Sequence, residues 1–322
     1  MNELAAYCSP LELVRWHLQF RAGSAGLLPA WLGSTWRGLF GHALRDAVCQ
    51  CDRRDANTCA LKATCPYIAL FEPRNGSIDT LLHPAQAAPA PFMLCPAAGG
   101  NIEADQILEV TLTLFGKARR HSGLVIRALI MGAMQGIGRE RLPLQPDGLV
   151  VLDADGQTHD ITLSELDDGH VPRIIPISTT PPWPGKARLH FTSPLRMRLR
   201  NRYIGPEELR FGDLVAQLLR RASLLRDFHC HHDAVEPELD FRAWVEHARA
   251  LDFVETRLTW QDLARQSSRQ QRRVPMGGVI GECVIAGDEF EPYWPLLWLG
   301  QWLGAGKGTT MGLGQYQCEA DG

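Results

Sequence analysis

The feature that most constrains the fold of this chain is a glycine-rich stretch at residues 300–316, which reads GQWLGAGKGTTMGLGQY. Glycine loses more backbone freedom on folding than any other residue, so such a density is costly unless something approaches the backbone closely. Exposed backbone N–H groups beside one ammonium group suit a phosphate, and we therefore predict a phosphate-binding loop. The residues expected to form it are Lys307, Gly304, Gly306, Gly308, Gly312 and Gly314.

The surroundings of Lys307 do not fit the nucleotide-binding P-loop. That motif needs a glycine five residues before the Gly-Lys pair and Ser or Thr directly after the lysine, but Gln301 and Gly308 occupy these positions. It also runs from strand to loop to helix. Here an apolar, helix-like run at 294–303 precedes the loop, and strand-like alternation at 311–317 follows it. The reversed order argues against an NTPase.

Composition narrows the class of protein. The 322 residues exceed the usual size of one domain, so we expect two domains. A net charge of −3 argues against a globally basic nucleic-acid binder but leaves room for a local basic face. No apolar run reaches the ~20 residues of a membrane span, and the N-terminus lacks a signal-peptide pattern. We expect a cytoplasmic protein with no membrane partner.

The basic residues are strongly skewed towards arginine, whose planar fork suits bidentate phosphate contacts. Codon bias in a GC-rich genome explains the skew equally well. Lysine occurs only at Lys62, Lys117, Lys186 and Lys307.

Hydrophobic periodicity divides the chain into two similar halves. In the first half it predicts strands at 13–20, 107–115, 149–153 and 159–163 and helices at 31–48 and 124–137, an order typical of a βαββαβ, ferredoxin-like unit. A proline-rich segment at 175–184 marks a boundary. The second half predicts strands at 186–199, 253–258 and 276–284 and helices at 207–229 and 294–303.

An arginine appears at every second position from 196 to 202, which predicts one face of a strand. This face could form the wall of a basic groove or a solvated edge strand.

Four motifs together resemble the CRISPR precursor-RNA-processing endoribonucleases of the RAMP superfamily. They are WRGLFGHALR at 36–45, CPYIALFEP at 65–73, SRQ at 268–270 followed by VPMGGVIG at 274–281, and GKGTTMGLG at 306–314. The resemblance implies an α+β protein with two tandem ferredoxin-like (RRM-like) domains. We place them at 1–175, with a cysteine cluster at 49–65, and at 185–322, with the glycine-rich loop at 304–314.

The resemblance also implies a function. The glycine-rich loop would contact CRISPR repeat RNA, and the precursor would be cut once per repeat without metal. The ribose 2′-OH would attack the adjacent phosphate, leaving a 2′,3′-cyclic phosphate and a 5′-OH, and the product would be retained. Expected partners are the crRNA and other subunits of a CRISPR ribonucleoprotein effector complex. One alternative is a non-catalytic RAMP subunit that only binds guide RNA, and another is a zinc-containing DNA-binding or scaffold protein.

Such cleavage needs an acid and a base, and histidine suits both roles because its ordinary titration range lies near neutral pH. We predict His42 as the catalytic histidine, because it lies off the apolar stripe of its helix beside Gly38 and Gly41. Arg37 and Arg45 would supply positive charge. The alternative is helix packing against the two glycines with His42 merely exposed.

His229 is a reserve candidate for the acid or base. It lies in the cluster of residues 227–232, which is too bunched for one tetrahedral metal ion and more typical of a polar helix end.

Further arginines precede the second glycine-rich motif, and beside an RNA-binding loop we expect them to contact phosphates. These are Arg265, Arg269, Arg272 and Arg273. A solvated loop is the usual alternative for such a basic run.

Four cysteines lie within seventeen residues: Cys49, Cys51, Cys59 and Cys65. In a cytoplasmic chain they suggest either a structural zinc site or reduced free thiols. Their spacing departs from the Cys-x2-Cys that the resembled family often shows, because Ala56 stands where the first cysteine of that pair would fall. No cofactor is expected in catalysis.

Overall fold

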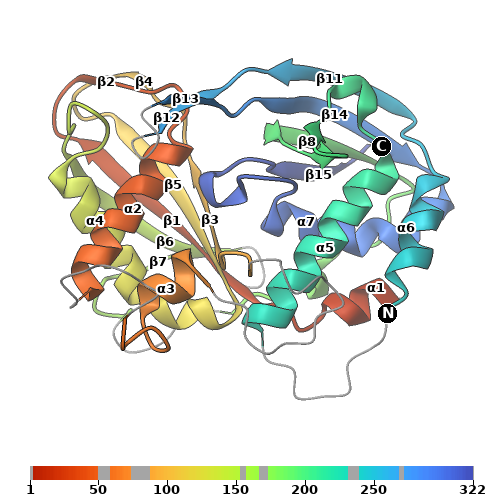
Figure 1. Cartoon of the computed structure of the whole chain (residues 1–322), viewed down its shortest axis with the longest axis horizontal. Helices are drawn as coiled ribbons and strands as arrows, with labels where there is room; N and C mark the ends of the chain where they lie inside the picture. The colour runs from red at the N-terminus through yellow and green to blue at the C-terminus, as the bar shows by residue number, and fades with distance from the viewer. Residues whose placement is uncertain are drawn as a thin grey trace. The chain divides into compact units, whose positions relative to one another are not determined.

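The computed structural model describes residues 3–49, 59–73, 88–152, 157–166, 173–230, 239–267 and 272–321. The chain forms two compact units (Figure 1). The N-terminal unit comprises Glu12–Ile174 and Leu224–His231, and the C-terminal unit comprises Met1–Leu11, Ile175–Ser223 and His232–Gly322. This division differs from the domain bounds expected from the sequence, since the first residues of the chain and the last turn of a long helix each belong to the other unit.

The N-terminal unit is built on a five-stranded antiparallel sheet in the order β3-β5-β1-β6-β7. The strands are β1 (Leu13–Ala22), β3 (Phe92–Pro96), β5 (Ile107–Phe115), β6 (Leu144–Leu152) and β7 (Thr158–Asp160). Two helices, α2 (Gly33–Val48) and α4 (Ser122–Gln135), cover one face (Figure 1). The order βαββαβ with these strand neighbours is the ferredoxin-like arrangement predicted from the periodicity.

The alternation of β1 places its two sets of side chains on opposite faces of the sheet. The apolar set is buried in the core beneath α2 and α4: Val14, Trp16, Leu18 and Phe20. The polar set makes cross-strand bonds to β5: Arg15 Nε donates to Thr113 Oγ1 (3.2 Å), and His17 Nδ1 lies 3.0 Å from Thr111 Oγ1.

The C-terminal unit repeats the arrangement with a four-stranded antiparallel sheet in the order β11-β14-β8-β15. Its strands are β8 (Lys186–Leu195), β11 (Glu255–Gln261), β14 (Gly278–Ala286) and β15 (Tyr316–Ala320). Its helices are α1 (Glu3–Cys8), α5 (Phe211–His229), α6 (Phe241–Arg249) and α7 (Trp294–Leu303). The prediction of two tandem ferredoxin-like units is therefore confirmed.

The proline-rich segment packs on the C-terminal unit, because two tryptophans of α7 bond to it. Trp294 Nε1 donates to the carbonyl of Pro181 (2.9 Å), and Trp298 Nε1 donates to Thr179 Oγ1 (3.2 Å). The remaining short elements are β2 (Gly26–Leu28), α3 (Pro66–Phe71), β4 (Gly100–Ile102), β9 (Arg198–Leu199), β10 (Arg202–Tyr203), β12 (Ala264–Ser267) and β13 (Arg272–Pro275). No helix within the described residues is long and apolar enough to cross a membrane.

Two local predictions are wrong. The arginines at 196–202 do not share one strand face, because β8 ends at Leu195 and the chain turns back through positive φ at Arg200 (45°) and Asn201 (68°) to form the β9–β10 hairpin. The last strand begins at Tyr316 rather than near 311, because Gly312 and Gly314 have φ of 80° and 71° and interrupt the extended chain.

Candidate functional site

All five glycines of the loop at 304–314, here called the glycine loop, have positive φ: Gly304 68°, Gly306 77°, Gly308 86°, Gly312 80° and Gly314 71°. The close approach expected at these positions is made by the protein itself in at least two cases. A Cβ on Gly306 would lie 2.5 Å from the carbonyl oxygen of Arg196, and one on Gly314 would lie 1.8 Å from that of Ala305. These two glycines are therefore needed for the backbone conformation of the loop, which has no room for a Cβ at either position.

Part of the glycine loop's backbone is already bonded. The N–H groups of Ala305 and Lys307 donate to the carbonyls of Gly314 (2.7 Å) and Arg196 (2.8 Å). The backbone N–H groups that donate no hydrogen bond within the described part of the chain belong to Gly306, Gly308, Thr309 and Thr310. The exposed Lys307 side chain makes no ion pair there either. A few donors beside one ammonium group thus remain for an anion.

The β9–β10 hairpin holds an exposed aromatic ring against arginine. The guanidinium carbon of Arg196, a residue only 8% exposed, lies 4.2 Å from the centroid of the Tyr203 ring, which is 42% exposed. Arg196 Nη1 also lies 3.2 Å from Met276 Sδ. The guanidinium of the exposed Arg198 lies 6.0 Å from the same ring centroid. Arg196 therefore links this cationic hairpin to the glycine loop through its carbonyl.

The predicted arginines before the second motif fall on the β12–β13 hairpin. Its register pairs Arg265 with Val274, Gln266 with Arg273, and Ser267 with Arg272. The side chains of Arg265, Arg272 and Arg273, and the whole of Arg269, lie outside the described residues, so their contact with RNA stays a prediction.

His42 is exposed on α2 and makes no hydrogen bond or ion pair within the described part of the chain. Gly38, one turn earlier, faces open space, since a Cβ there would meet nothing within 4 Å. Gly41 differs, because a Cβ there would lie 3.2 Å from Phe71 of α3. The close packing of α3 thus explains why a glycine stands at position 41. At Gly38 no side chain covers the helix backbone, so this backbone is accessible beside His42.

The two predicted arginines of α2 lie against α3. Arg45 stacks on Tyr67, with 4.2 Å from its guanidinium carbon to the ring centroid, and its Nη2 lies 3.6 Å from a carboxylate oxygen of Glu72. Arg37 lies 5.3 Å from the ring centroid of Phe71. Arg45 is three residues from His42, which places the two on neighbouring faces of the helix.

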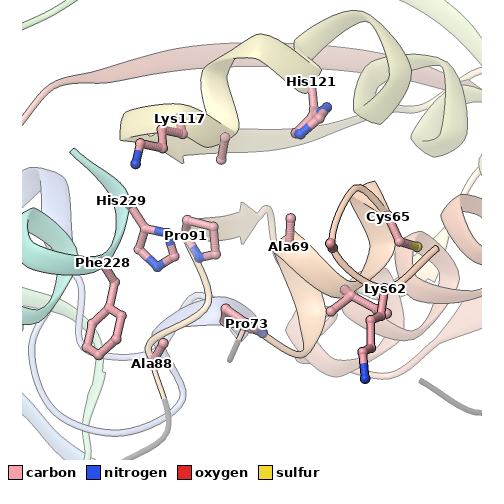
Figure 2. Close-up of a pocket in the computed structure, with 13 residues that line it drawn as sticks. Lys62, Cys65, Ala69, Pro73, Ala88, Pro91, Lys117, His121, Phe228 and His229 are labelled. Carbon is pink, nitrogen blue, oxygen red and sulfur yellow. The ribbon is translucent and has the colours of Figure 1, made fainter. Parts of the chain in front are cut away.

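A pocket of about 460 Å³ lies within the N-terminal unit. Figure 2 shows Phe228 and His229 on one side of it, Lys62 and Cys65 on the opposite side, and Lys117 and His121 on a third. The walls come from α3 with its preceding turn, the 3₁₀ turn Gly116–His121, the chain before β3 and the end of α5. Of these residues, only His229 and Cys65 were singled out as site candidates from the sequence.

His229 is buried, and its Nε2 lies 2.7 Å from the carbonyl oxygen of Pro89, to which it donates its proton. Burial lowers the pKa of His229 to about 4, against the raising effect of the Pro89 bond and with a smaller lowering effect of Lys117. Its imidazole is therefore neutral at pH 7, and the Nε2 proton is committed to the backbone. His229 is therefore not free to give this proton to a leaving group, and its burial contrasts with the exposure of His42.

The zinc prediction cannot be tested on the described residues, because Cys51 lies outside them. Cys49, Cys59 and Cys65 form no disulfide bond within the described residues. No three His, Cys, Asp or Glu side chains gather as metal ligands in the part of the chain that is described. The zinc site stays a prediction, which metal analysis of the purified protein can test.

Residues 189–316, which carry the glycine loop and the β9–β10 hairpin, match the family model of the CRISPR-associated endoribonuclease Cas6. This part of the chain therefore forms a Cas6 endoribonuclease domain. The domain match supports an endoribonuclease that processes CRISPR RNA, and the binding-only RAMP alternative is not better supported. Residues 11–172 match a second family model, AF_1859_N, whose description is an N-terminal domain.

Solved Cas6 structures share the fold at low sequence identity. The Cas6 (TTHB231) product complex has a TM-score of 0.58 and 17% identity, covering 95% of this chain and 100% of that one. The Thermus thermophilus Cas6 (TTHB231) has a TM-score of 0.52 and 16% sequence identity, and the match covers 96% of this chain and 99% of that one. A chain of a partial Cas6-RT-Cas1–Cas2 complex has a TM-score of 0.56 and 12% sequence identity, and the match covers 96% of this chain and 46% of that one. No curated protein matches the chain.

Proposed function

We propose that this protein cuts precursor CRISPR RNA once within each repeat by an internal attack that needs no metal. The ribose 2′-oxygen forms a bond to the adjacent phosphorus while the bond from phosphorus to the 5′-oxygen breaks. The products are a 2′,3′-cyclic phosphate and a 5′-OH, and the protein retains the cyclic-phosphate product. The observation that carries the proposal is the Cas6 family match, together with an exposed, unbonded histidine beside a bare glycine on α2.

In this mechanism His42 accepts the proton of the 2′-OH, and the departing 5′-oxygen takes a proton from water. The exposure of His42 supports this role, because its imidazole is committed to no other group in the described part of the chain. Arg45 supplies positive charge for the phosphorane from the neighbouring face of the helix, with Arg37 one turn before Gly41. Glu72 lies near enough to Arg45 to offset part of that charge.

The C-terminal unit holds the RNA through the glycine loop and the β9–β10 hairpin. Lys307 and the unbonded N–H groups of the loop contact a phosphate, and the exposed ring of Tyr203 stacks on an unpaired base. Two contacts of Arg196 support this role of the hairpin. Its carbonyl accepts a hydrogen bond from the backbone of Lys307 in the loop, and its guanidinium packs against the ring of Tyr203.

The proposal extends to other CRISPR proteins as partners. A solved relative of the same fold is a partial Cas6-RT-Cas1–Cas2 complex. We place the protein in the cytoplasm, where its precursor RNA is made.

The test is cleavage of repeat RNA in EDTA, beside the same RNA with a single 2′-deoxy substitution at the nucleotide before the cut. The proposal predicts that the first RNA is cut and the second is not. Cleavage of the 2′-deoxy RNA, or loss of all cleavage in EDTA that Mg²⁺ restores, would refute internal attack without metal.

A further inference from the structure

Trp260 is an exposed tryptophan of the C-terminal unit. It lies on β11, an edge strand of the sheet, which pairs only with β14 in the described part of the chain (Figure 1). All nine tryptophans lie within the described residues, and Trp260 alone among them is exposed, with 42% of its surface accessible. Because burial of so large an apolar ring would stabilise the fold, an exposed one points to a binding surface.

Two contacts hold the ring of Trp260 in place. Its Nε1 donates a hydrogen bond of 2.9 Å to a carboxylate oxygen of Asp262. Gly277 packs against the ring, since a Cβ on that glycine would lie 3.0 Å from Nε1 and 3.2 Å from Cε2 of Trp260. A ring that is fixed in advance loses little side-chain entropy when a ligand binds. The carboxylate of Asp262 repels a phosphate, so a base rather than the RNA backbone is expected at this ring.

The contacts continue from Gly277 to the β9–β10 hairpin. Gly278 is the next residue, and a Cβ there would lie 2.9 Å from Arg196 Cγ. The guanidinium of Arg196 in turn packs against the exposed ring of Tyr203. The two glycines of the second motif therefore let Trp260 and Arg196 pack directly on the backbone. Two exposed aromatic rings are thus connected through one arginine within a single unit.

Arg196 brings an uncompensated positive charge to this surface. The residue is only 8% exposed, makes no ion pair in the described part of the chain, and has a buried Nε without a hydrogen-bond partner there. Arg202 of the same hairpin is paired instead with Glu208. A buried guanidinium that lacks an acceptor costs free energy, and a negatively charged ligand nearby offsets part of that cost. Positive charge beside exposed rings fits single-stranded nucleic acid, which presents both phosphates and flat bases.

We propose that Trp260 is a second base-stacking residue for the repeat RNA, and that Trp260 and Tyr203 stack on two different unpaired bases of one strand. The inference rests on the proposed function, because its ligand is the RNA that the C-terminal unit holds. Every base has a face that can stack, so the two rings select for a single-stranded segment rather than for particular bases. The RNA at this surface is therefore unpaired at both positions.

The experiment is a set of double-mutant cycles between the protein and the RNA. Repeat RNA with a 2′-deoxy substitution before the cut is used in EDTA, and a series of such RNAs carries one abasic nucleotide at each position in turn. Affinities are measured for the full-length wild type, Trp260→Leu and Tyr203→Leu at one fixed salt concentration.

We expect Trp260→Leu to weaken binding of the RNA without an abasic site about tenfold. One abasic position should weaken binding to the wild type by a similar factor and cause no further loss in Trp260→Leu, since both changes remove the same contact. A different abasic position should show this coupling with Tyr203→Leu. Trp260→Tyr keeps a ring and should restore both the affinity and the coupling.

Val254→Ala is the matched control, because Val254 is a 63% exposed apolar residue directly before the same strand. It should bind every RNA as the wild type does, and urea denaturation verifies that all variants are folded. The inference is overturned if Trp260→Leu binds as the wild type does, if no abasic position loses its effect in that variant, if Trp260→Tyr restores nothing, or if Val254→Ala weakens binding equally.

The inference and the proposed function can fail separately. Coupling with Tyr203→Leu alone would overturn the role of Trp260 and leave the proposed function intact. Coupling with Trp260→Leu alone would support the role of Trp260 as a stacking residue and remove Tyr203 from base stacking. Cleavage of the 2′-deoxy RNA, visible in the same samples, would refute the proposed mechanism without bearing on either ring.

Discussion

The backbone N–H of Lys307 donates a hydrogen bond of 2.8 Å to the carbonyl oxygen of Arg196. This bond joins the glycine loop to the hairpin that carries Tyr203, although more than a hundred residues of chain separate them. Two predicted RNA-contacting elements of the C-terminal unit therefore form one assembly. A change that displaces the loop is expected to displace the hairpin as well.

Gly306→Ala tests the packing between loop and hairpin. Gly306 combines a φ of 77° with a carbonyl oxygen 2.5 Å from where a Cβ would lie. We expect the free energy of unfolding to fall by at least about 2 kcal/mol, measured by urea denaturation. Gly185→Ala is the matched control, because Gly185 has a φ of 78° but open space around it, so only the backbone strain of about 1 kcal/mol is expected. Equal losses in both variants would show that the contact with Arg196 carries no energy.

Gly38→Ala separates stability from activity. Because Gly38 lies inside α2 with nothing within 4 Å of a new Cβ, alanine should raise the free energy of unfolding by up to about 1 kcal/mol. If RNA approaches the bare backbone beside His42, the same change should slow cleavage about tenfold or more. A stabilised variant that cleaves at the wild-type rate would show that the RNA does not approach this part of α2.

Tyr203→Leu should weaken binding of repeat RNA about tenfold, because stacking of one base on an aromatic side chain contributes roughly 1–3 kcal/mol. Tyr203→Phe keeps the ring and should bind as the wild type does. Both affinities can be measured by filter binding at one fixed salt concentration. Weakening by Phe to the same extent as by Leu would point to the hydroxyl group and against stacking.

His229 predicts a pH dependence of stability. Its folded pKa of about 4 lies below the ordinary 6.5, so between these values the unfolded chain binds more protons than the folded one. The contribution is therefore fully present above pH 6.5 and is lost as the pH falls towards 4, by roughly 3 kcal/mol at most. His229→Gln should flatten the curve of unfolding free energy between pH 6.5 and 4. An unchanged slope in that variant would place the titrating group elsewhere.

The periodic elements could be predicted from the sequence because each depends on its own apolar stripe. The strand at Ile107–Phe115 and the helix at Trp294–Leu303 were predicted with the bounds that the structure has. The β9–β10 hairpin could not, because alternating arginines indicate a strand and only the positive φ at Arg200 and Asn201 turns the chain. The pocket was also missed, since its walls come from segments far apart in the sequence and no single motif connects Lys62 with Lys117 and Phe228.

The central claim is that His42 takes part in the chemistry, and the single-turnover cleavage rate of His42→Ala on saturating repeat RNA tests it most directly. General acid–base catalysis contributes about 10²–10⁴-fold, so we expect a loss of at least about a hundredfold with RNA affinity unchanged. His159→Ala removes another exposed histidine of the same unit, on β7, and should cleave as the wild type does. A wild-type rate in His42→Ala would contradict the account.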